Sequence, residues 1–324
     1  MSEEKSMWTG LLHAGIATFL GRPYYKIEDI PTITKAAVLG IPFDGTCIAR
    51  TGTNYGPRAL RDASSQFISY HPYFNIDIVK EYNLVDCGDV QVVLGNPKKT
   101  IDKAAEVLKQ LFKKGIMPVI LGGEHLISVA GTKAMSETYQ NNLGLIVFDC
   151  HLDTAYDVGG ELYNHCCPWP RTIELSGGKF KGSNIAIIGV GALNPKEEWE
   201  YAKKHGITAF TIEEIEEKGI EEVTKEAIKI AKEGTDGLYV SIDIDVLDAA
   251  FAPGTGVPTP GGLTSREIIK AIRLIGTAGF NAIDLTEVSP PYDKGGATAY
   301  LGCRILLDAL AANARNLKNR EAKT

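Results

Sequence analysis

Short, continuous runs of apolar residues constrain the fold of this chain more than any other feature. Residues 143–148, for example, read Leu-Gly-Leu-Ile-Val-Phe, without the alternation of apolar and polar residues that a half-exposed strand shows. Such runs are typical of parallel strands that are covered on both faces. Longer segments with helical periodicity separate them. This alternation predicts an α/β fold, a three-layer α/β/α sandwich with a mainly parallel sheet of about eight strands.

The predicted strands lie at residues 36–41, 84–86, 117–121, 143–149, 184–190, 208–210, 237–243 and 281–284. The predicted helices lie at residues 57–67, 100–113, 125–139, 220–233, 265–276 and 298–312. Because no internal repeat, low-complexity tract or long linker divides the chain, we expect a single domain over residues 1–324. Residues 1–30 are expected to form an arm on the domain or on a neighbouring subunit, and residues 316–324 a frayed tail.

Composition limits the compartments in which the protein is expected and the partners that it is expected to bind. A net charge of -6 without a basic run argues against a nucleic-acid partner. Six cysteines lack the spacing of a disulfide framework, which favours free thiols in a reducing compartment. The apolar stretch 8–20 is too short to span a bilayer, and the acidic first residues lack the basic region of a signal peptide. We therefore expect a cytoplasmic protein with no membrane partner.

Two aspartates and a histidine follow the most apolar of the predicted strands. Asp149, His151 and Asp153 occupy alternate positions in the segment Asp-Cys-His-Leu-Asp. Alternate side chains of an extended segment point the same way, so these three are expected to face one side. Because α/β proteins bind ligands at the carboxyl ends of their strands, this segment is a candidate site.

Two further segments place similar residues after other strands. Asp243 and Asp245 alternate in Ser-Ile-Asp-Ile-Asp, and Asp248 follows three positions later. His125 ends the segment Gly-Gly-Glu-His, whose glycines permit a close approach of the backbone. Any one of these residues alone would be interpreted as a helix cap, a turn former or a buried polar side chain. Their combination and spacing favour a shared site.

The combined charge of these segments predicts bound metal. Leaving Asp248 aside, four aspartates and two histidines would meet at three strand ends, and so many carboxylates need a counter-charge. Mixed oxygen and nitrogen ligands suit Mn²⁺ or a similar divalent ion. Two such ions about 3.5–4 Å apart can share a water and lower its pKa enough to form hydroxide near neutral pH.

The three segments resemble the signatures of the ureohydrolase (arginase) family, and the resemblance extends from about Val38 to the C-terminal helix. It implies the arginase-like fold, two Mn²⁺ ions per chain with Ni²⁺ as another possible ion, and a homotrimer or homohexamer. It also implies metal ligation by His125, Asp149, His151, Asp153, Asp243 and Asp245.

The resemblance implies three catalytic roles as well. Glu287, in Asp-Leu-Thr-Glu-Val-Ser-Pro-Pro, matches the glutamate that pairs with the substrate guanidinium, which its two coplanar oxygens suit. His165 matches the histidine that shuttles protons, and Asp153 also orients the hydroxide. The expected reaction is attack on the guanidinium carbon, followed by collapse of a tetrahedral intermediate to urea and an amine.

Residues around the ligands bear on the choice of guanidino substrate. Arginases place an asparagine where this chain has Ala155, which speaks against arginine, and residues 42–58 resemble the agmatinase branch. Asp157 and Glu161 would then receive the ammonium of agmatine, unless they only form a solvated acidic loop. Arg50 would instead favour a guanidino acid such as 4-guanidinobutyrate. Agmatine is the first choice and the guanidino acid the alternative.

Several positions depart from the family pattern or have two interpretations. Thr255 lines the pocket or only forms a turn. Cys166, Cys167 and Trp169 replace a more usual segment after His165 and are expected to alter the pocket wall. Cys150, between two ligands, is a soft extra ligand or, as we favour, a small buried residue.

Two other classes of protein compete with the ureohydrolase interpretation. A deacetylase on the related fold would use one Zn²⁺ ion, which the full set of six ligands argues against. A catalytically silent scaffold would typically have lost a ligand, and this chain retains all six.

Overall fold

The computed structural model describes residues 15–321, and a central parallel sheet organises them. The sheet has eight strands in the order β4-β1-β5-β10-β9-β6-β7-β8, and every pair of neighbours is parallel. The strands are β1 (Ala36–Ile41), β4 (Val85–Asp89), β5 (Met117–Gly122), β6 (Leu143–Phe148), β7 (Phe180–Val190), β8 (Thr208–Thr211), β9 (Gly237–Asp243) and β10 (Ala282–Thr286). The predicted sandwich with about eight strands is confirmed.

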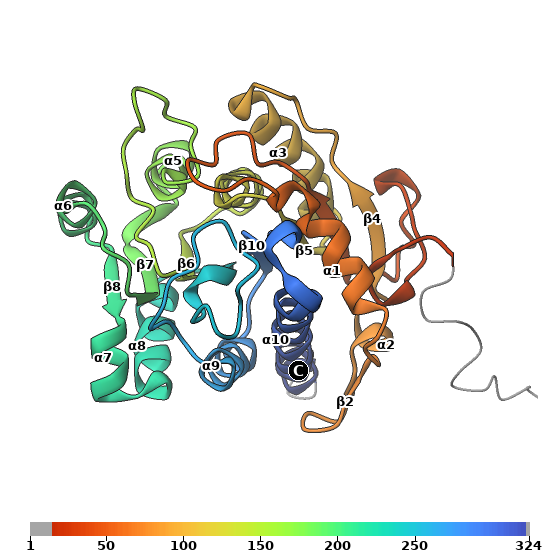
Figure 1. Ribbon diagram of the computed structural model, residues 1–324. Coiled ribbons are helices and arrows are strands. Elements are labelled where there is room, and N and C mark those ends of the chain that lie inside the picture. Colours follow the sequence, from red (N-terminus) through yellow and green to blue (C-terminus); the bar gives the residue numbers. More distant parts are fainter. Residues whose placement is uncertain (1–14, 322–324) are drawn as a thin grey trace, which may run out of the picture.

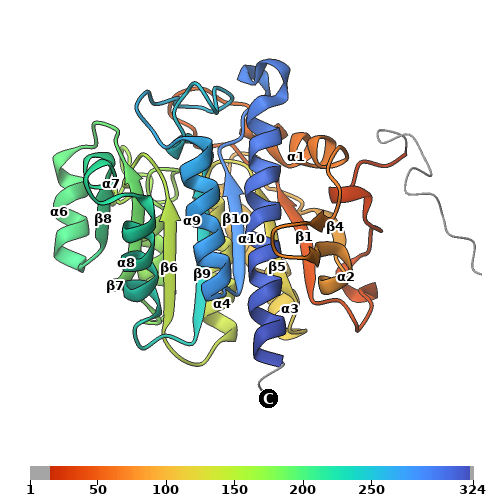
Figure 2. The same cartoon turned by 90° about the horizontal axis from the view of Figure 1, so that it is seen from below.

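Helices cover both faces of the sheet, which explains the continuous apolar strands (Figure 1). In Figure 2 three long helices lie in front of the strands: α8 (Ile220–Lys232), α9 (Ser265–Ala278) and α10 (Ala297–Glu321). The other face packs against α3 (Pro97–Lys113) and α4 (Ser128–Thr138). Two buried apolar clusters result, one on each side of the sheet, and every residue of β6, β9 and β10 is buried.

Strand register aligns the carboxyl ends of the central strands. Phe148, the last residue of β6, pairs with Ile242 in β9, and Asp243 at the end of β9 pairs with Thr286 at the end of β10. Residues that follow these strands therefore leave the sheet side by side. This edge is where the predicted metal ligands lie.

Several short elements were absent from the sequence prediction. The expected helix near residue 57 is α1 (Gly56–Ser64). The elements that were not expected are the short paired strands β2 (Tyr70–His71) and β3 (Ile76–Asp77) and the helices α2 (Ile78–Tyr82), α5 (Pro168–Leu175), α6 (Lys196–His205) and α7 (Ile212–Lys218). In α6 only Glu198 and Ala202 are buried, so the helix lacks an apolar stripe that periodicity could reveal. It nevertheless borders the candidate site.

The two ends of the described chain both lie against the domain. Near the N-terminal end, Phe19 is buried and its N–H donates to Asp86 Oδ2 at 2.7 Å; residues 1–14 of the expected arm lie outside the described residues. Helix α10 continues to Glu321, with Leu317 packed on the core and Lys318 paired with Glu81. Among the residues that the structure describes, no helix is long and apolar enough to cross a membrane.

Candidate metal centre and substrate pocket

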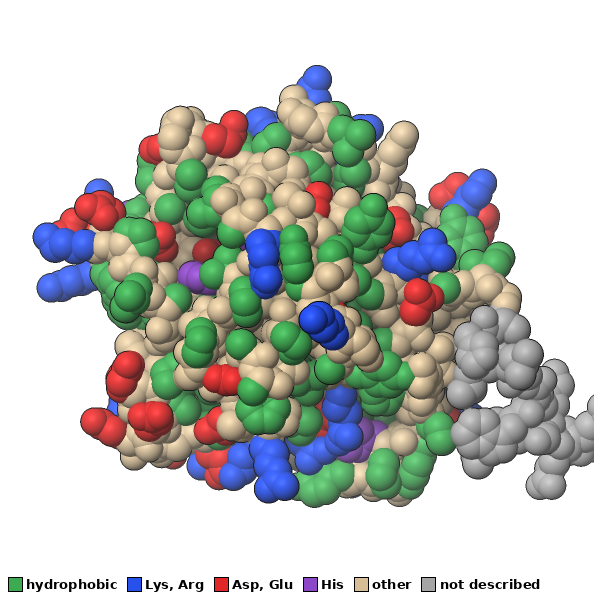
Figure 3. Space-filling view, in the orientation of Figure 1, with side chains coloured by type: hydrophobic (Ala, Val, Ile, Leu, Met, Phe, Trp, Pro, Cys, Tyr) green, Lys and Arg blue, Asp and Glu red, His purple; other side chains and the backbone are tan. Residues whose placement is uncertain are grey.

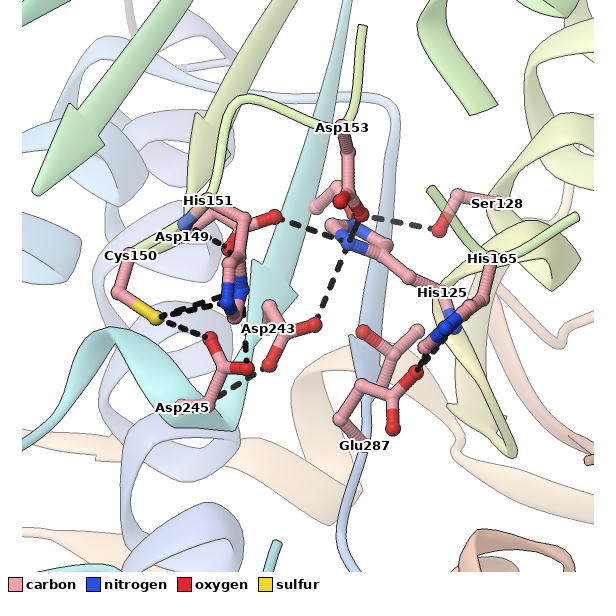
Figure 4. Close-up of polar contacts among 12 residues, drawn as sticks. His125, Ser128, Asp149, Cys150, His151, Asp153, His165, Asp243, Asp245 and Glu287 are labelled. Atoms are coloured by element: carbon pink, nitrogen blue, oxygen red, sulfur yellow. Dashed lines mark hydrogen bonds and ion pairs between the residues drawn. The ribbon is translucent and has the colours of Figure 1, made fainter. Parts of the chain in front are cut away.

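The six predicted metal ligands converge at the carboxyl edge of the sheet (Figure 4). Nδ1 of His125 is the meeting point of the first group. It lies 3.0 Å from Asp149 Oδ2, 2.8 Å from Asp153 Oδ2 and 3.3 Å from Asp243 Oδ2. All four side chains are buried, so the structure brings together residues separated by more than a hundred positions.

A second group adjoins the first and shares one residue with it. His151 Nδ1 lies 3.5 Å from Asp149 Oδ1 and 3.3 Å from Asp245 Oδ2. Asp149 therefore contributes one oxygen to each group. A carboxylate shared between two ligand sets is the arrangement that two neighbouring cations require.

The carboxylates of these groups repel one another, and burial together with this repulsion raises the pKa of two of them. Burial raises the pKa of Asp153 to about 6, and the charge of Asp149 adds to the rise. Burial, Asp245 and Asp149 raise the pKa of Asp243 well above its ordinary value. Divalent cations would relieve this repulsion, since opposite charges favour the ionised form of a carboxyl group.

Hydrogen bonding around His125 leaves its inward nitrogen available to a cation. Its Nε2 lies 3.0 Å from Ser241 Oγ, which itself donates to Asp284 Oδ1 at 2.7 Å. Ser241 therefore accepts from Nε2–H, and Nδ1 keeps its lone pair. Nδ1 of His125 and Oδ2 of Asp149 are buried and form no hydrogen bond with the residues described. The donor set fits a dinuclear metal centre.

Two of the functional residues hold an unfavourable backbone conformation. Asp153 has φ 50° and Glu287 has φ 62°, the left-handed region that residues other than glycine seldom adopt. The loop with Asp153 is fastened from outside, because Leu152 N–H donates to Asn194 Oδ1 at 2.9 Å and Thr154 N–H to Glu198 Oε2 at 3.3 Å. Such fixed strain is common at functional sites.

Glu287 and His165 lie together beside the ligands. Glu287 Oε1 accepts from the His125 N–H at 2.8 Å and lies 3.4 Å from His165 Nδ1. The Ile48 N–H lies 3.2 Å from His165 Nε2, so in the neutral ring Nε2 accepts from it and the proton resides on Nδ1. Burial lowers the pKa of His165, but hydrogen bonds with Cys166 and Glu287 raise it overall, to about 11. The pair offers a carboxylate and a proton donor to the same small volume.

Glu124 organises the loop that carries Cys47 and Ile48, a role the sequence did not reveal. The buried Glu124 carboxylate accepts hydrogen bonds from the N–H and hydroxyl of Thr46 and from Cys47 Sγ. Thr46 Oγ1 in turn accepts from the His165 N–H at 3.0 Å. A Cβ on Gly123 would lie 2.0 Å from the Phe43 carbonyl oxygen, so this approach requires glycine, as expected from the motif.

A pocket of about 340 Å³ opens above this centre. Its floor includes the ligands His151, Asp153, Asp243 and Asp245, and its walls include mainly apolar residues: Ile48, Ala49, Leu193, Pro195 and Val257. In Figure 3 histidine and acidic side chains are visible in a recess bordered by hydrophobic ones. The charged groups of the wall are Arg50, Glu198 and Glu287. Glu198 was not predicted, because it stands in a highly charged helix without a motif.

The predicted substrate-tail residues are not gathered at this pocket. Asp157 and Glu161 are exposed, accept from the N–H groups of Gly160 and Tyr163 within their own loop, and do not line it. Arg50 lines the pocket, but its Nε donates to Gly256 O at 3.0 Å and its Nη2 to Thr255 O at 2.6 Å. Its guanidinium also stacks 4.1 Å from the ring centre of Tyr292. Thr255 is buried beside the pocket, and its backbone positions Arg50.

The unusual cysteines and tryptophan take different positions. Cys166 lines the pocket, whereas Trp169 is fully buried and packs edge-on against His125, with ring centres 5.1 Å apart. Cys167 is buried as well. Cys150 Sγ donates to Asp245 Oδ1 at 3.1 Å and to Thr259 Oγ1 at 3.3 Å, so this thiol contacts a metal ligand from outside the pocket.

Comparisons with known proteins match nearly the whole chain. The model of the arginase family matches residues 34–312. An agmatinase of Bacillus subtilis strain 168 is 34% identical over 300 residues, which cover 92% of this chain and 96% of the relative. A guanidinopropionase of Pseudomonas aeruginosa is 33% identical over 302 residues, 92% and 91% of the two chains. The solved proclavaminate amidinohydrolase of Streptomyces clavuligerus superposes with a TM-score of 0.88 at 31% identity, covering 95% of this chain and all of that one.

Proposed function

The chain belongs to the arginase family of metal-dependent hydrolases, and from this membership we propose that it hydrolyses agmatine to putrescine and urea with two Mn²⁺ ions. The observation that carries the proposal is the pair of ligand groups that share Asp149, with Glu287 facing the same pocket. Its relatives act on different guanidino compounds, so the substrate is argued from this chain's own residues.

The ligand geometry supports one set of residues for each ion. His125, Asp153 and Asp243 would hold one ion, His151 and Asp245 the other, and Asp149 both. When bound, two divalent cations neutralise the carboxylates and supply a water that ionises near neutral pH. Ni²⁺ is an alternative to Mn²⁺ at such mixed ligands.

The side chains around the ions have separate tasks in the reaction. Glu287 pairs with the guanidinium, Asp153 accepts a hydrogen bond from the attacking water, and His165 holds a proton on Nδ1 next to Glu287. A carbon–oxygen bond forms at the guanidinium carbon, and the bond from that carbon to the substituted nitrogen breaks. The nitrogen takes up a proton, for which His165 in its imidazolium form is the positioned donor, and leaves as the amine while urea remains.

The pocket wall supports agmatine over arginine and keeps one alternative. Ala155 offers no polar group to an α-amino-acid head, and apolar residues form most of the wall. Arg50 is the observation that favours a guanidino acid such as 4-guanidinobutyrate, as does the likeness to a guanidinopropionase. The carbonyl oxygens already bonded to its Nε and Nη2 weaken that alternative.

Urea release from purified protein tests the proposal. The protein is loaded with Mn²⁺, Ni²⁺ or Zn²⁺ and given agmatine, 4-guanidinobutyrate, arginine, guanidinopropionate and guanidine. We expect kcat/KM for agmatine to exceed that for arginine by at least about tenfold, roughly 1.4 kcal/mol of discrimination. A higher value for guanidinobutyrate, lost in Arg50→Ala, would replace agmatine with the alternative. No urea from any compound would instead favour a silent scaffold.

The wider setting is part of the proposal. We expect a homotrimer or homohexamer in the cytoplasm, with free cysteines. Light scattering of the purified protein measures the assembly, and a monomer at micromolar concentration would contradict it.

A further inference from the structure

Glu198 is an acidic residue of the pocket that the reaction leaves unused. It projects from α6 and is 8% exposed, and its Oε2 accepts from the Thr154 N–H at 3.3 Å. Its Oε1 accepts no hydrogen bond from the described residues, and none of their Lys, Arg or His side chains forms an ion pair with it. The other acidic residues of the lining are metal ligands or Glu287. Glu198 is thus a pocket carboxylate without an ion-pair partner among the described residues.

Glu198 and Glu287 lie on opposite sides of the metal ligands. Glu287 follows β10 and Glu198 follows β7, and the sheet order places β9 and β6 between these strands. Glu198 stands on α6, eight residues after the end of β7, and its carboxylate contacts Thr154 in the loop that follows β6. Both residues line the same pocket, so a short aliphatic chain with a positive charge at each end can face both carboxylates.

The wall around these carboxylates matches such a molecule. Ile48, Leu193, Pro195 and Val257 present apolar surface, which methylene groups can cover without loss of hydrogen bonds. Arg50, the one Lys or Arg of the wall, is bonded to two carbonyl groups and stacked on Tyr292. A positive tail therefore meets an uncompensated carboxylate, and a negative tail meets a guanidinium that is already engaged.

We propose that Glu198 forms a subsite for the cationic end of the substrate, at the far side of the pocket from the guanidinium site at Glu287. The inference rests on the proposed hydrolysis of a guanidino compound and specifies its substrate class: an alkylguanidine with a terminal ammonium. The subsite lies on α6, whereas the exposed acids Asp157 and Glu161 take no part in it.

Electrostatics supports the assignment. Burial raises the pKa of Glu198 to about 7, and the nearby charge of Asp153 adds to the rise. An ammonium group beside the carboxylate opposes both effects and stabilises its ionised form. A charge-assisted contact in a buried place is stronger than one at the surface.

The test compares two substrates that differ only in the tail charge. Wild-type protein and Glu198→Gln, both loaded with Mn²⁺, are assayed with agmatine and with 1-pentylguanidine, in which a methyl group replaces the ammonium. We expect Glu198→Gln to lower kcat/KM for agmatine at least about tenfold, mainly through KM, and that for pentylguanidine by less than about twofold. Glu197→Gln, the same change at an exposed neighbour on α6, should leave both substrates unaffected.

Glu198 also accepts a hydrogen bond from the Thr154 N–H, so binding of the substrate tail has to be distinguished from positioning of the loop that carries Asp153. An equal loss for agmatine and pentylguanidine, or a loss of bound metal, would show that Glu198 only fastens the ligand loop and would overturn the subsite. Calorimetric binding of both compounds to metal-loaded protein gives a second measurement: tighter binding of agmatine that disappears in Glu198→Gln supports the subsite even without turnover. Absence of urea from wild-type protein would contradict the proposed function separately. Glu198→Asp keeps the charge and should retain most of the preference for agmatine over pentylguanidine, whereas loss of that preference in Glu198→Asp would contradict a role of the charge.

Discussion

The floor and the wall of the pocket are built in different ways. The floor consists of buried side chains at the ends of β6, β9 and β10 and just after β5, and parallel register fixes their positions. The wall consists of residues from four loops and α6, several of them exposed, such as Leu193 and Ile48. The difference indicates that the floor supplies chemistry that tolerates little change, whereas the wall can vary and selects the substrate.

The largest expected effect follows from a change in the floor. Asp243→Asn removes a charge that faces His125 and both neighbouring carboxylates, so metal affinity and turnover should fall by more than the roughly 10–100-fold typical of residues outside the ligand set. The melting temperature of the metal-free form should change little, because the repulsion of Asp243 by Asp245 and Asp149 is relieved. Metal content is measured by elemental analysis, and chelation followed by Mn²⁺ should abolish and then restore activity.

Asp248→Asn is the matched control for that change. Asp248 stands in the same segment, but its oxygens accept from the N–H groups of Ala250 and Gly261 and not at the metal centre. It should retain two ions per chain. Active wild-type protein with one ion per chain, or none, would refute the dinuclear assignment.

The same contrast explains what sequence reasoning could predict. Asp149, His151 and Asp153 follow the apolar strand β6 directly, so recognition of that strand places them at its carboxyl end, although the left-handed turn at Asp153 could not be predicted from their alternation. Asp157 and Glu161 were expected at the substrate tail because they follow these ligands in the sequence, but the loop turns away and satisfies their carboxylates locally. Glu198 reaches the pocket only through the packing of α6 after β7, which no local pattern encodes. Proximity in sequence thus brings residues to the floor more directly than to the wall.

Glu287 lies between floor and wall, and its substitution is expected to have the next largest effect. Glu287→Gln keeps the shape and the bond from the His125 N–H but removes the charge opposite a guanidinium. Loss of a charge-assisted contact should cost about 1.5–3 kcal/mol, roughly a ten- to two-hundredfold fall in kcat/KM. Two ions per chain should remain bound. Unchanged kinetics would assign Glu287 to structure alone and move the guanidinium site elsewhere.

The hydrogen bond that Ser241 forms with the metal ligand His125 should contribute somewhat less to activity than Glu287 does. Ser241→Ala disconnects His125 Nε2 from Asp284 and frees the histidine to change tautomer. Mn²⁺ affinity, measured by competition with a chelator, should fall by roughly 10–100-fold. Tyr239→Phe removes the other hydroxyl bonded to Asp284 without touching His125 and should have the smaller effect on affinity. Equal effects would mean that the charge of Asp284, rather than the orientation of His125, determines the Mn²⁺ affinity.

The smallest expected effect concerns the acidic loop. Asp157 and Glu161 are exposed, bonded to their own loop and absent from the pocket lining, so a charge there acts on a substrate only through screened solvent. The double change Asp157→Asn with Glu161→Gln should therefore alter kcat/KM for agmatine by less than about twofold at 0.15 M salt, where charges more than about 8 Å apart are largely screened. At low salt a slightly larger decrease is expected, because the loop then contributes to the attraction of a cation. A tenfold loss at 0.15 M salt, with Glu198→Gln neutral, would reverse the assignment: the loop would have to close over the bound substrate, and the tail would be recognised there instead of on α6.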